Sequence, residues 1–131
     1  MKDFTAPEGF DGVSDKLAGG AAWFRNEEGA TLRGEIQARI ERKERPGEYF
    51  YRVKLSQACP VVRNKLPETA MPLQVVNIDE KYDLRPLASL PTDKRWEIFV
   101  QCLGKQDIGG GKSMWKFGVA RREITEDQIP F

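Results

Sequence analysis

The stretch ATLRGEIQARIE, residues 30–41, alternates between apolar and polar side chains without a break. Successive side chains of an extended strand point to opposite faces, so this pattern predicts a long β-strand with one buried face. Gly34 lies inside the stretch, and a glycine within a strand often marks a bulge or a sharp bend. We therefore expect a long, curved first strand that serves both halves of a small barrel.

Four further stretches have strand character. The Pro46-Gly47 pair predicts a turn, so residues 49–59 are expected to form a hairpin with the first strand. The proline-bounded stretch 60–72 is expected to be a long loop. The sequence then predicts a third strand at 73–78, a fourth at 96–103 and a fifth at 114–121, with a glycine-rich connection at 104–113 between the last two.

A short helix is expected between the third and fourth strands. Asp83 can cap it, leucines recur at positions 84, 87 and 90, and Pro91 ends it. Five strands with one short helix in that place is the element order of the OB-fold, a partly open Greek-key barrel that binds oligonucleotides. The predicted fold class is therefore all-β: an irregular arm at 1–29, a five-stranded OB-fold at 30–122 and an acidic tail at 123–131.

Composition excludes several classes of function. A chain of 131 residues fits one domain, and the absence of histidine excludes Ser-His-Asp and Cys-His catalysis. Cys59 and Cys102 form no close pair, so neither a disulfide framework nor a cysteine metal site is expected. Asp79, Glu80 and Asp83 fit helix capping better than metal binding. The amino terminus lacks an apolar stretch, so we expect a cytoplasmic protein without a membrane span, metal, cofactor or enzymatic activity.

Charge is distributed unevenly along the chain. The net charge is +1, but residues 30–122 hold 18 Lys and Arg against 11 Asp and Glu, a net charge of +7. The arm and the tail each carry a net charge of −3. A basic body between acidic ends is typical of a protein that binds polyanions, although ordinary surface solubility produces such charges as well.

The chain ends in EDQIPF, residues 126–131. This end resembles the tip of the bacterial single-stranded DNA-binding protein family, in which a run of Asp leads into Ile-Pro-Phe; Gln128 stands where the family usually has another acid. The resemblance implies an OB-fold, assembly into a homo-oligomer, and a tip that docks on enzymes of replication, recombination or repair. The docking residues would be Glu126, Asp127, Ile129, Pro130 and Phe131. The family's long linker is missing, which suggests a divergent member, encoded by a host or a phage.

The second predicted strand offers a binding surface. If Tyr51 and Val53 face the core, Phe50, Arg52 and Lys54 lie on the opposite face, where cations neutralise phosphates and aromatic rings stack on bases. An unbroken register places Arg33 and Arg39 outward beside them. The two flanking loops that an OB-fold uses for nucleic acid add further cations. The candidate residues are Arg33, Arg39, Arg42, Lys43, Arg45, Phe50, Arg52, Lys54, Lys105 and Lys112. Cover of Phe50 by the arm or by a second subunit is an equal alternative to stacking. For the cations the alternative is a solvated face.

The leading hypothesis is a non-enzymatic protein that coats single-stranded DNA with little sequence preference and recruits partner enzymes through Phe131. One rival is an OB-fold interaction or inhibitor module that uses the tip as a decoy for host enzymes. The other is a carboxylate-dependent nuclease, which no cluster of acids on strands supports. DNA and single-stranded RNA stay open alternatives, because readout of the 2′-hydroxyl depends on geometry.

Overall fold

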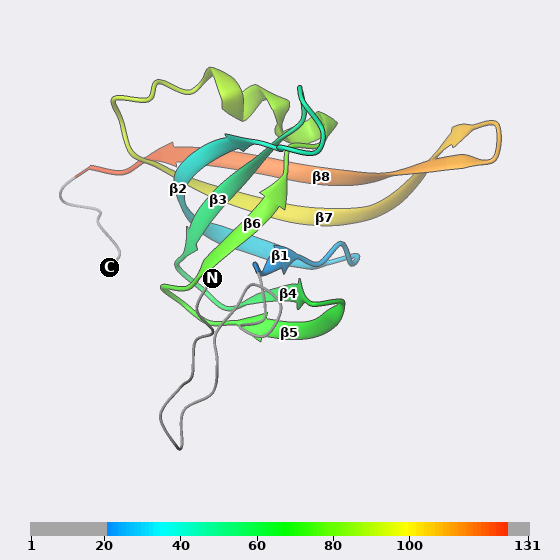
Figure 1. The fold of residues 1–131 in the computed structure, drawn as a ribbon, viewed down its shortest axis with the longest axis horizontal. Coiled ribbons are helices and arrows are strands. Elements are labelled where there is room, and N and C mark those ends of the chain that lie inside the picture. Colours follow the sequence, from blue (N-terminus) through cyan, green and yellow to red (C-terminus); the bar gives the residue numbers. More distant parts are fainter. Residues whose placement is uncertain (1–20, 126–131) are drawn as a thin grey trace, which may run out of the picture.

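The computed structural model describes residues 21–125. The predicted docking residues at 126–131, and residues 1–20 of the predicted arm, lie outside the described residues. Within 21–125, eight strands form one open sheet that curls into a half-barrel, with a single short 3₁₀-helix against it (Figure 1). None of the helical segments in this part of the chain has the length and apolar character needed to cross a bilayer.

The strands follow in the order β1 (Trp23–Phe24), β2 (Thr31–Glu41), β3 (Tyr49–Leu55), β4 (Cys59–Arg63), β5 (Leu66–Ala70), β6 (Val75–Asp79), β7 (Trp96–Gly109) and β8 (Lys112–Glu123). The helix η1 (Tyr82–Ser89) lies between β6 and β7. Neighbouring strands in the sheet are β5-β4-β1-β6-β3-β2-β7-β8. All neighbours are antiparallel except β1 and β6, which are parallel.

The prediction of an all-β fold with one short helix is confirmed. The predicted number of five strands is wrong, because the sheet of residues 21–125 has eight. The five predicted strands correspond to β2, β3, β6, β7 and β8. The expected loop at 60–72 contains the β4–β5 hairpin instead. Its turn residues Asn64 and Lys65 have positive φ angles of 51° and 66°, as a type I′ turn requires. Lysine is unusual at the second of these positions, so residues 64–65 carry no clear turn signal.

Both ends of the predicted barrel also extend further than expected. Trp23 pairs with Asn77 of β6 and with Val62 of β4, so the last part of the predicted arm belongs to the sheet. β8 continues to Glu123, one residue into the predicted tail. The predicted connection at 104–113 shrinks to Gly110 and Gly111, because the β7–β8 ladder continues to the pair Gly109–Lys112. The two strands form a ribbon that extends away from the body of the molecule (Figure 1).

The bulge in β2 lies three residues beyond Gly34. Ile36 pairs with Val53 and Ala38 with Arg52, so Gln37 is the extra residue. Gly34 has another function: a Cβ there would lie 2.2 Å from the carbonyl oxygen of Lys54, so only glycine allows β3 to approach so closely.

The bulge reverses the direction of every later β2 side chain. Arg39 lies opposite Tyr51, which is 1% exposed, and therefore points to the core side of the sheet. The expectation that Arg33 and Arg39 share the outer face is wrong, because the extra residue changes the register between them.

The core lies between the inner face of the curled sheet and η1. The fully buried side chains include Leu32, Val53, Leu55, Val76, Leu84, Ile98 and Val100. Phe24 and Phe117 pack with ring centroids 6.4 Å apart and join β1 to β8, which are not neighbours in the sheet. Each such side chain contributes roughly 1.5–3 kcal/mol when fully buried, so this layer fixes the curvature that positions the surface residues.

Candidate nucleic-acid interface

Two adjoining hollows lie where the β2–β3 hairpin approaches the start of η1. The first is lined by Trp23, Phe24, Asn26, Arg42, Ile78, Asp79, Lys81 and Phe117. The second is lined by Arg42, Arg45, Gly47, Glu48, Tyr49, Asp79, Glu80, Lys81, Tyr82 and Arg85. They share Arg42, Asp79 and Lys81, and together we call them the groove. Aromatic rings and cations both line it, which is the combination that holds unpaired nucleotides.

Arg42 occupies the middle of the groove. Its backbone N–H donates to the carbonyl of Glu48 at 2.8 Å, which holds the end of the hairpin closed. Its guanidinium carbon lies 4.5 Å from the ring centroid of Trp23 and 5.7 Å from that of Phe50. Nε donates to Asp79 at 3.1 Å, and Nη1 donates to Glu44 at 3.2 Å. The acids fix the guanidinium in a stacked position, so the cation and the two rings form one preformed surface.

Trp23 and Phe50 form the aromatic part of that surface. Their centroids are 5.0 Å apart and their planes are inclined at 56°. Both side chains are half-buried. The outward direction of Phe50 is as expected, and its partial cover by Trp23 matches the alternative in which the arm protects it.

Tyr82 lines the second hollow of the groove. It is 65% exposed, and the cationic groups of Arg85 and Lys116 each lie 5.9 Å from its ring centroid. Lys81 and Arg45 are exposed nearby, and Arg45 pairs with Glu48 at 3.6 Å. The sequence reasoning missed Trp23, Lys81, Tyr82 and Arg85. In the sequence, the available signal was a tyrosine between two cations, Lys81 and Arg85. Only the fold shows that this tyrosine is exposed and lines a hollow together with the hairpin.

Glu80, which lines the second hollow, joins β2 and β3 to the segment that leads into η1. Arg39 donates to its two carboxylate oxygens at 2.7 and 2.8 Å, and the Tyr51 hydroxyl also donates to it. Burial alone would raise the pKa of Glu80, but the bonds from Arg39 and Tyr51 outweigh it and lower that pKa. Burial raises the pKa of Tyr51, and the adjacent carboxylate raises it further. Arg39 is therefore a structural ion-pair partner in this arrangement.

The outer face of β3 continues from the groove. Phe50 lies between Ile40 and Asp79 in the sheet, and Arg52 lies between Ala38 and Asn77. Arg52 is exposed and Lys54 half-buried, as expected for the face opposite the core. This strip of Phe50, Arg52 and Lys54 leads along the sheet toward the start of β2.

The remaining predicted cations are spread over three places. Lys43 lies exposed in the β2–β3 turn. Lys105 lies on β7, with Nζ 5.1 Å from the ring centroid of Trp115, and Lys112 begins β8 near the end of the ribbon, so both lie on strands and not in a loop. Arg33 lies at the far end of β2, where it pairs with Glu97 at 3.2 Å. The structure thus brings Arg42, Lys43, Arg45 and Phe50 together, with Arg52 and Lys54 on the adjoining strip, whereas Arg33, Lys105 and Lys112 lie apart and Arg39 points to the inner side.

Within residues 21–125, no group of three or more cysteine or acidic side chains is placed to hold a metal ion. Comparison with protein-family models, with curated proteins and with solved structures gives no match.

Proposed function

We propose that this chain is a non-enzymatic, cytoplasmic protein that binds single-stranded DNA with little sequence preference. In this proposal β2, β3, β6, β7 and β8 form an OB-fold. The groove and the adjoining β3 strip hold the single-stranded DNA. The supporting observation is the Arg42 guanidinium stacked over Trp23, at the junction of two hollows lined by aromatic and cationic side chains.

The chemistry favours unpaired strands for a physical reason. Exposed Lys81 and Arg85 can neutralise phosphates, while the open ring of Tyr82 offers a stacking face to a base. Stacking requires a base that is free to leave its neighbours, which a duplex does not supply. Because every base has an aromatic face, such contacts discriminate little between sequences.

A salt titration with two exposed variants tests the proposal. Fluorescence anisotropy with labelled oligo-dT of about 20 nucleotides should give a log affinity that falls with log salt by about 0.7 per neutralised phosphate. Tyr82→Ala should weaken binding roughly 5- to 150-fold, the equivalent of one lost base stack. Leu66→Ala is the matched control, because Leu66 on β5 is 64% exposed, against 65% for Tyr82. Absence of binding at low salt, or equal affinity for all three proteins, would refute the proposal.

We propose further that the tip recruits enzymes of replication, recombination or repair and that the protein acts as a homo-oligomer. Both rest on the sequence resemblance at 126–131. An acidic tail tethered to a cationic surface has a high effective concentration there, so it should compete with DNA. Deletion of residues 126–131 should tighten oligo-dT binding and abolish partner capture, and unchanged behaviour in both assays would remove the tail from the proposal.

A second candidate is a protein-interaction or inhibitor module that uses the tip as a decoy. One observation favours it: the predicted cations Arg33, Arg39, Arg42 and Arg45 all form ion pairs, which leaves less charge for phosphates. This candidate predicts partner binding without affinity for oligo-dT. The same titration therefore separates the two.

A further inference from the structure

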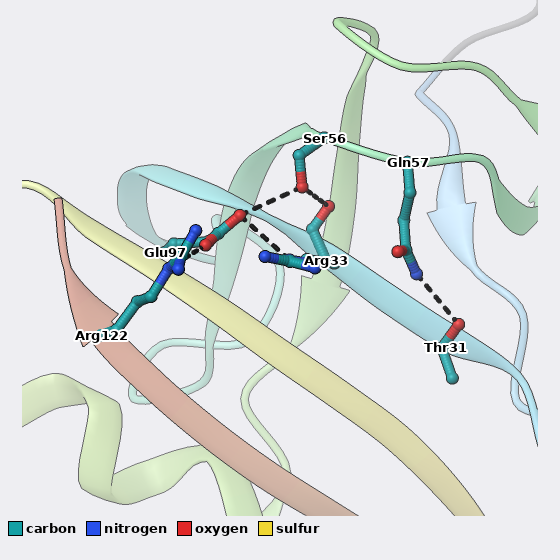
Figure 2. A network of polar contacts seen from close by, with 6 residues as sticks. All are labelled: Thr31, Arg33, Ser56, Gln57, Glu97 and Arg122. Carbon is teal, nitrogen blue, oxygen red and sulfur yellow. Dashed lines mark hydrogen bonds and ion pairs between the residues drawn. The ribbon is translucent and has the colours of Figure 1, made fainter. Parts of the chain in front are cut away.

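A second cluster of charged residues lies on the outer face at the opposite end of β2. Glu35 and Glu97 face each other across β2 and β7 and are 6% and 3% exposed. Arg95 binds Glu35, with Nε donating at 2.6 Å. Arg33 and Arg122 approach Glu97 from opposite sides, and the Ser56 hydroxyl donates to it at 3.2 Å (Figure 2). Two buried carboxylates side by side are tolerated because three guanidinium groups surround them.

The environment of Glu97 leaves an excess of positive charge. Burial would raise the pKa of Glu97, but Arg33 and Arg122 outweigh it and lower that pKa, so the carboxylate is charged and the trio carries +1. Each arginine donates to Glu97 through Nε. In the described part of the chain, Glu97 is the only carboxylate that pairs with either arginine. Glu97 orients both guanidinium groups, and their side chains are 43% and 50% exposed, which leaves room for a further acceptor at the terminal nitrogens.

An aromatic ring lies beside these nitrogens. Phe99 stands between Arg33 on β2 and Ala120 on β8 in the sheet, and it is 38% exposed. Arg33, Glu97, Phe99, Ala120 and Arg122 line one hollow. The small side chain of Ala120 leaves one side of the ring uncovered. The cluster therefore combines two fixed cations with an accessible aromatic face.

We propose that Arg33, Phe99 and Arg122 form a second nucleotide subsite, in which the two guanidinium groups bind one phosphate and the Phe99 ring contacts a base. This inference rests on the proposed function, since the same single strand of DNA would occupy the groove. Arg33 lies near the start of β2 and Arg42 directly follows its end, so the two residues are at most about 30 Å apart at 3.3 Å per residue. Arg52 and Lys54 lie between them on the neighbouring strand β3. One single-stranded nucleic acid can therefore follow the whole path from the groove to the subsite.

Oligonucleotide length separates the two sites. Oligo-dT of about 20 nucleotides is longer than the roughly 4–16 nucleotides that one such barrel covers, and oligo-dT of about 5 nucleotides lies at the lower end of that range, so we expect it to occupy the groove without the second site. Phe99→Ala should weaken binding of the long oligonucleotide roughly 5- to 150-fold and leave the short one unchanged. Tyr82→Ala should weaken both.

A charge-balanced variant tests the phosphate contact. The double substitution Glu97→Gln with Arg122→Gln keeps the net charge and leaves no buried carboxylate without a partner. It should weaken binding of the long oligonucleotide roughly 10- to 150-fold, the equivalent of one lost charge-assisted hydrogen bond, while the salt slope stays the same because Arg33 still supplies the positive charge. Lys94→Gln with Glu123→Gln removes another ion pair, of 3.8 Å, outside both sites and should leave the affinity unchanged.

The outcomes are distinguishable. If the wild-type protein fails to bind the long oligonucleotide, the proposed function falls, and the subsite falls with it. If the wild-type protein binds but Phe99→Ala binds equally well, or the double variant binds as tightly as the wild type, the subsite is refuted while the proposed function stands. Thermal unfolding of each variant ensures that an affinity loss does not come from loss of the fold.

Discussion

Arg39 lies directly opposite Tyr51 in the β2–β3 ladder, and both side chains donate to the carboxylate of Glu80. This arrangement exists because Gln37 is an extra residue in β2. The bulge turns Arg39 from the outer face to the inner side, where it ties the hairpin to the segment that leads into η1. An arginine that resembles a phosphate contact in the sequence thereby supports one wall of the groove.

Removal of the Tyr51 hydroxyl should destabilise the fold without unfolding it. Tyr51→Phe deletes one bond to Glu80 but leaves both bonds from Arg39, so we expect the free energy of unfolding to fall by about 1–3 kcal/mol. Urea denaturation measures it. Tyr82→Phe alters an exposed hydroxyl and should stay close to wild type, and an equal loss for both variants would argue against a special role of Tyr51.

Stability should fall in acid, because the pKa values of Glu80 and Glu97 are lowered in the fold. The unfolded chain returns both to an ordinary value of about 4.3, so their contribution is complete above that pH. It is lost as the pH falls from there through the lower pKa values of the folded state. Urea midpoints measured from about pH 7 to about pH 3 should be level at first and then decline. A midpoint that does not change over the acidic part of this range contradicts the pairing.

Gly34→Ala should destabilise the fold much more than Gly118→Ala. At Gly34 a new Cβ would meet the Lys54 carbonyl oxygen at 2.2 Å, and the backbone of β3 cannot yield without loss of the ladder. We expect a loss of at least about 1–3 kcal/mol in the free energy of unfolding. At Gly118 the nearest atom is Cδ1 of Leu103 at 3.9 Å, so alanine fits there. Similar unfolding midpoints for the two variants would refute the steric argument.

Arg42→Lys should separate geometry from charge in the groove. Lysine keeps the positive charge but cannot stack a planar fork on Trp23 while it binds a phosphate through two N–H groups. We expect oligo-dT affinity to fall roughly 2- to 30-fold with little change in salt slope. Arg63→Lys on β4, outside the groove, is the control. If lysine at position 42 binds as tightly as arginine, charge alone explains the contact.

Several elements could be predicted because their signals are local. The alternation at 30–41 and the leucines at 84 and 87 each describe a segment that buries one face, and Pro46-Gly47 marks the turn between β2 and β3; each element lies close to where expected. The expected cap of the helix is wrong, because Asp83 lies inside η1 and Lys81 is its N-cap. The β4–β5 hairpin was missed because Lys65 occupies a position where glycine gives the usual signal. The two-residue strand β1 has no periodicity at all, and only its pairing with β4 and β6 defines it.

The sequence predicts the type of candidate site, a basic and aromatic surface, but it does not identify which residues line it. The sequence by itself determined an all-β chain with a helix before the last two strands, a basic middle and an outward strip on β3, because alternation and charge are properties of neighbouring residues. The tertiary structure alone decided which cations stay available. Arg39 meets Glu80 across 41 positions and Arg33 meets Glu97 across 64. Ion pairs over such separations depend on strand register, and in β2 one extra residue sets that register.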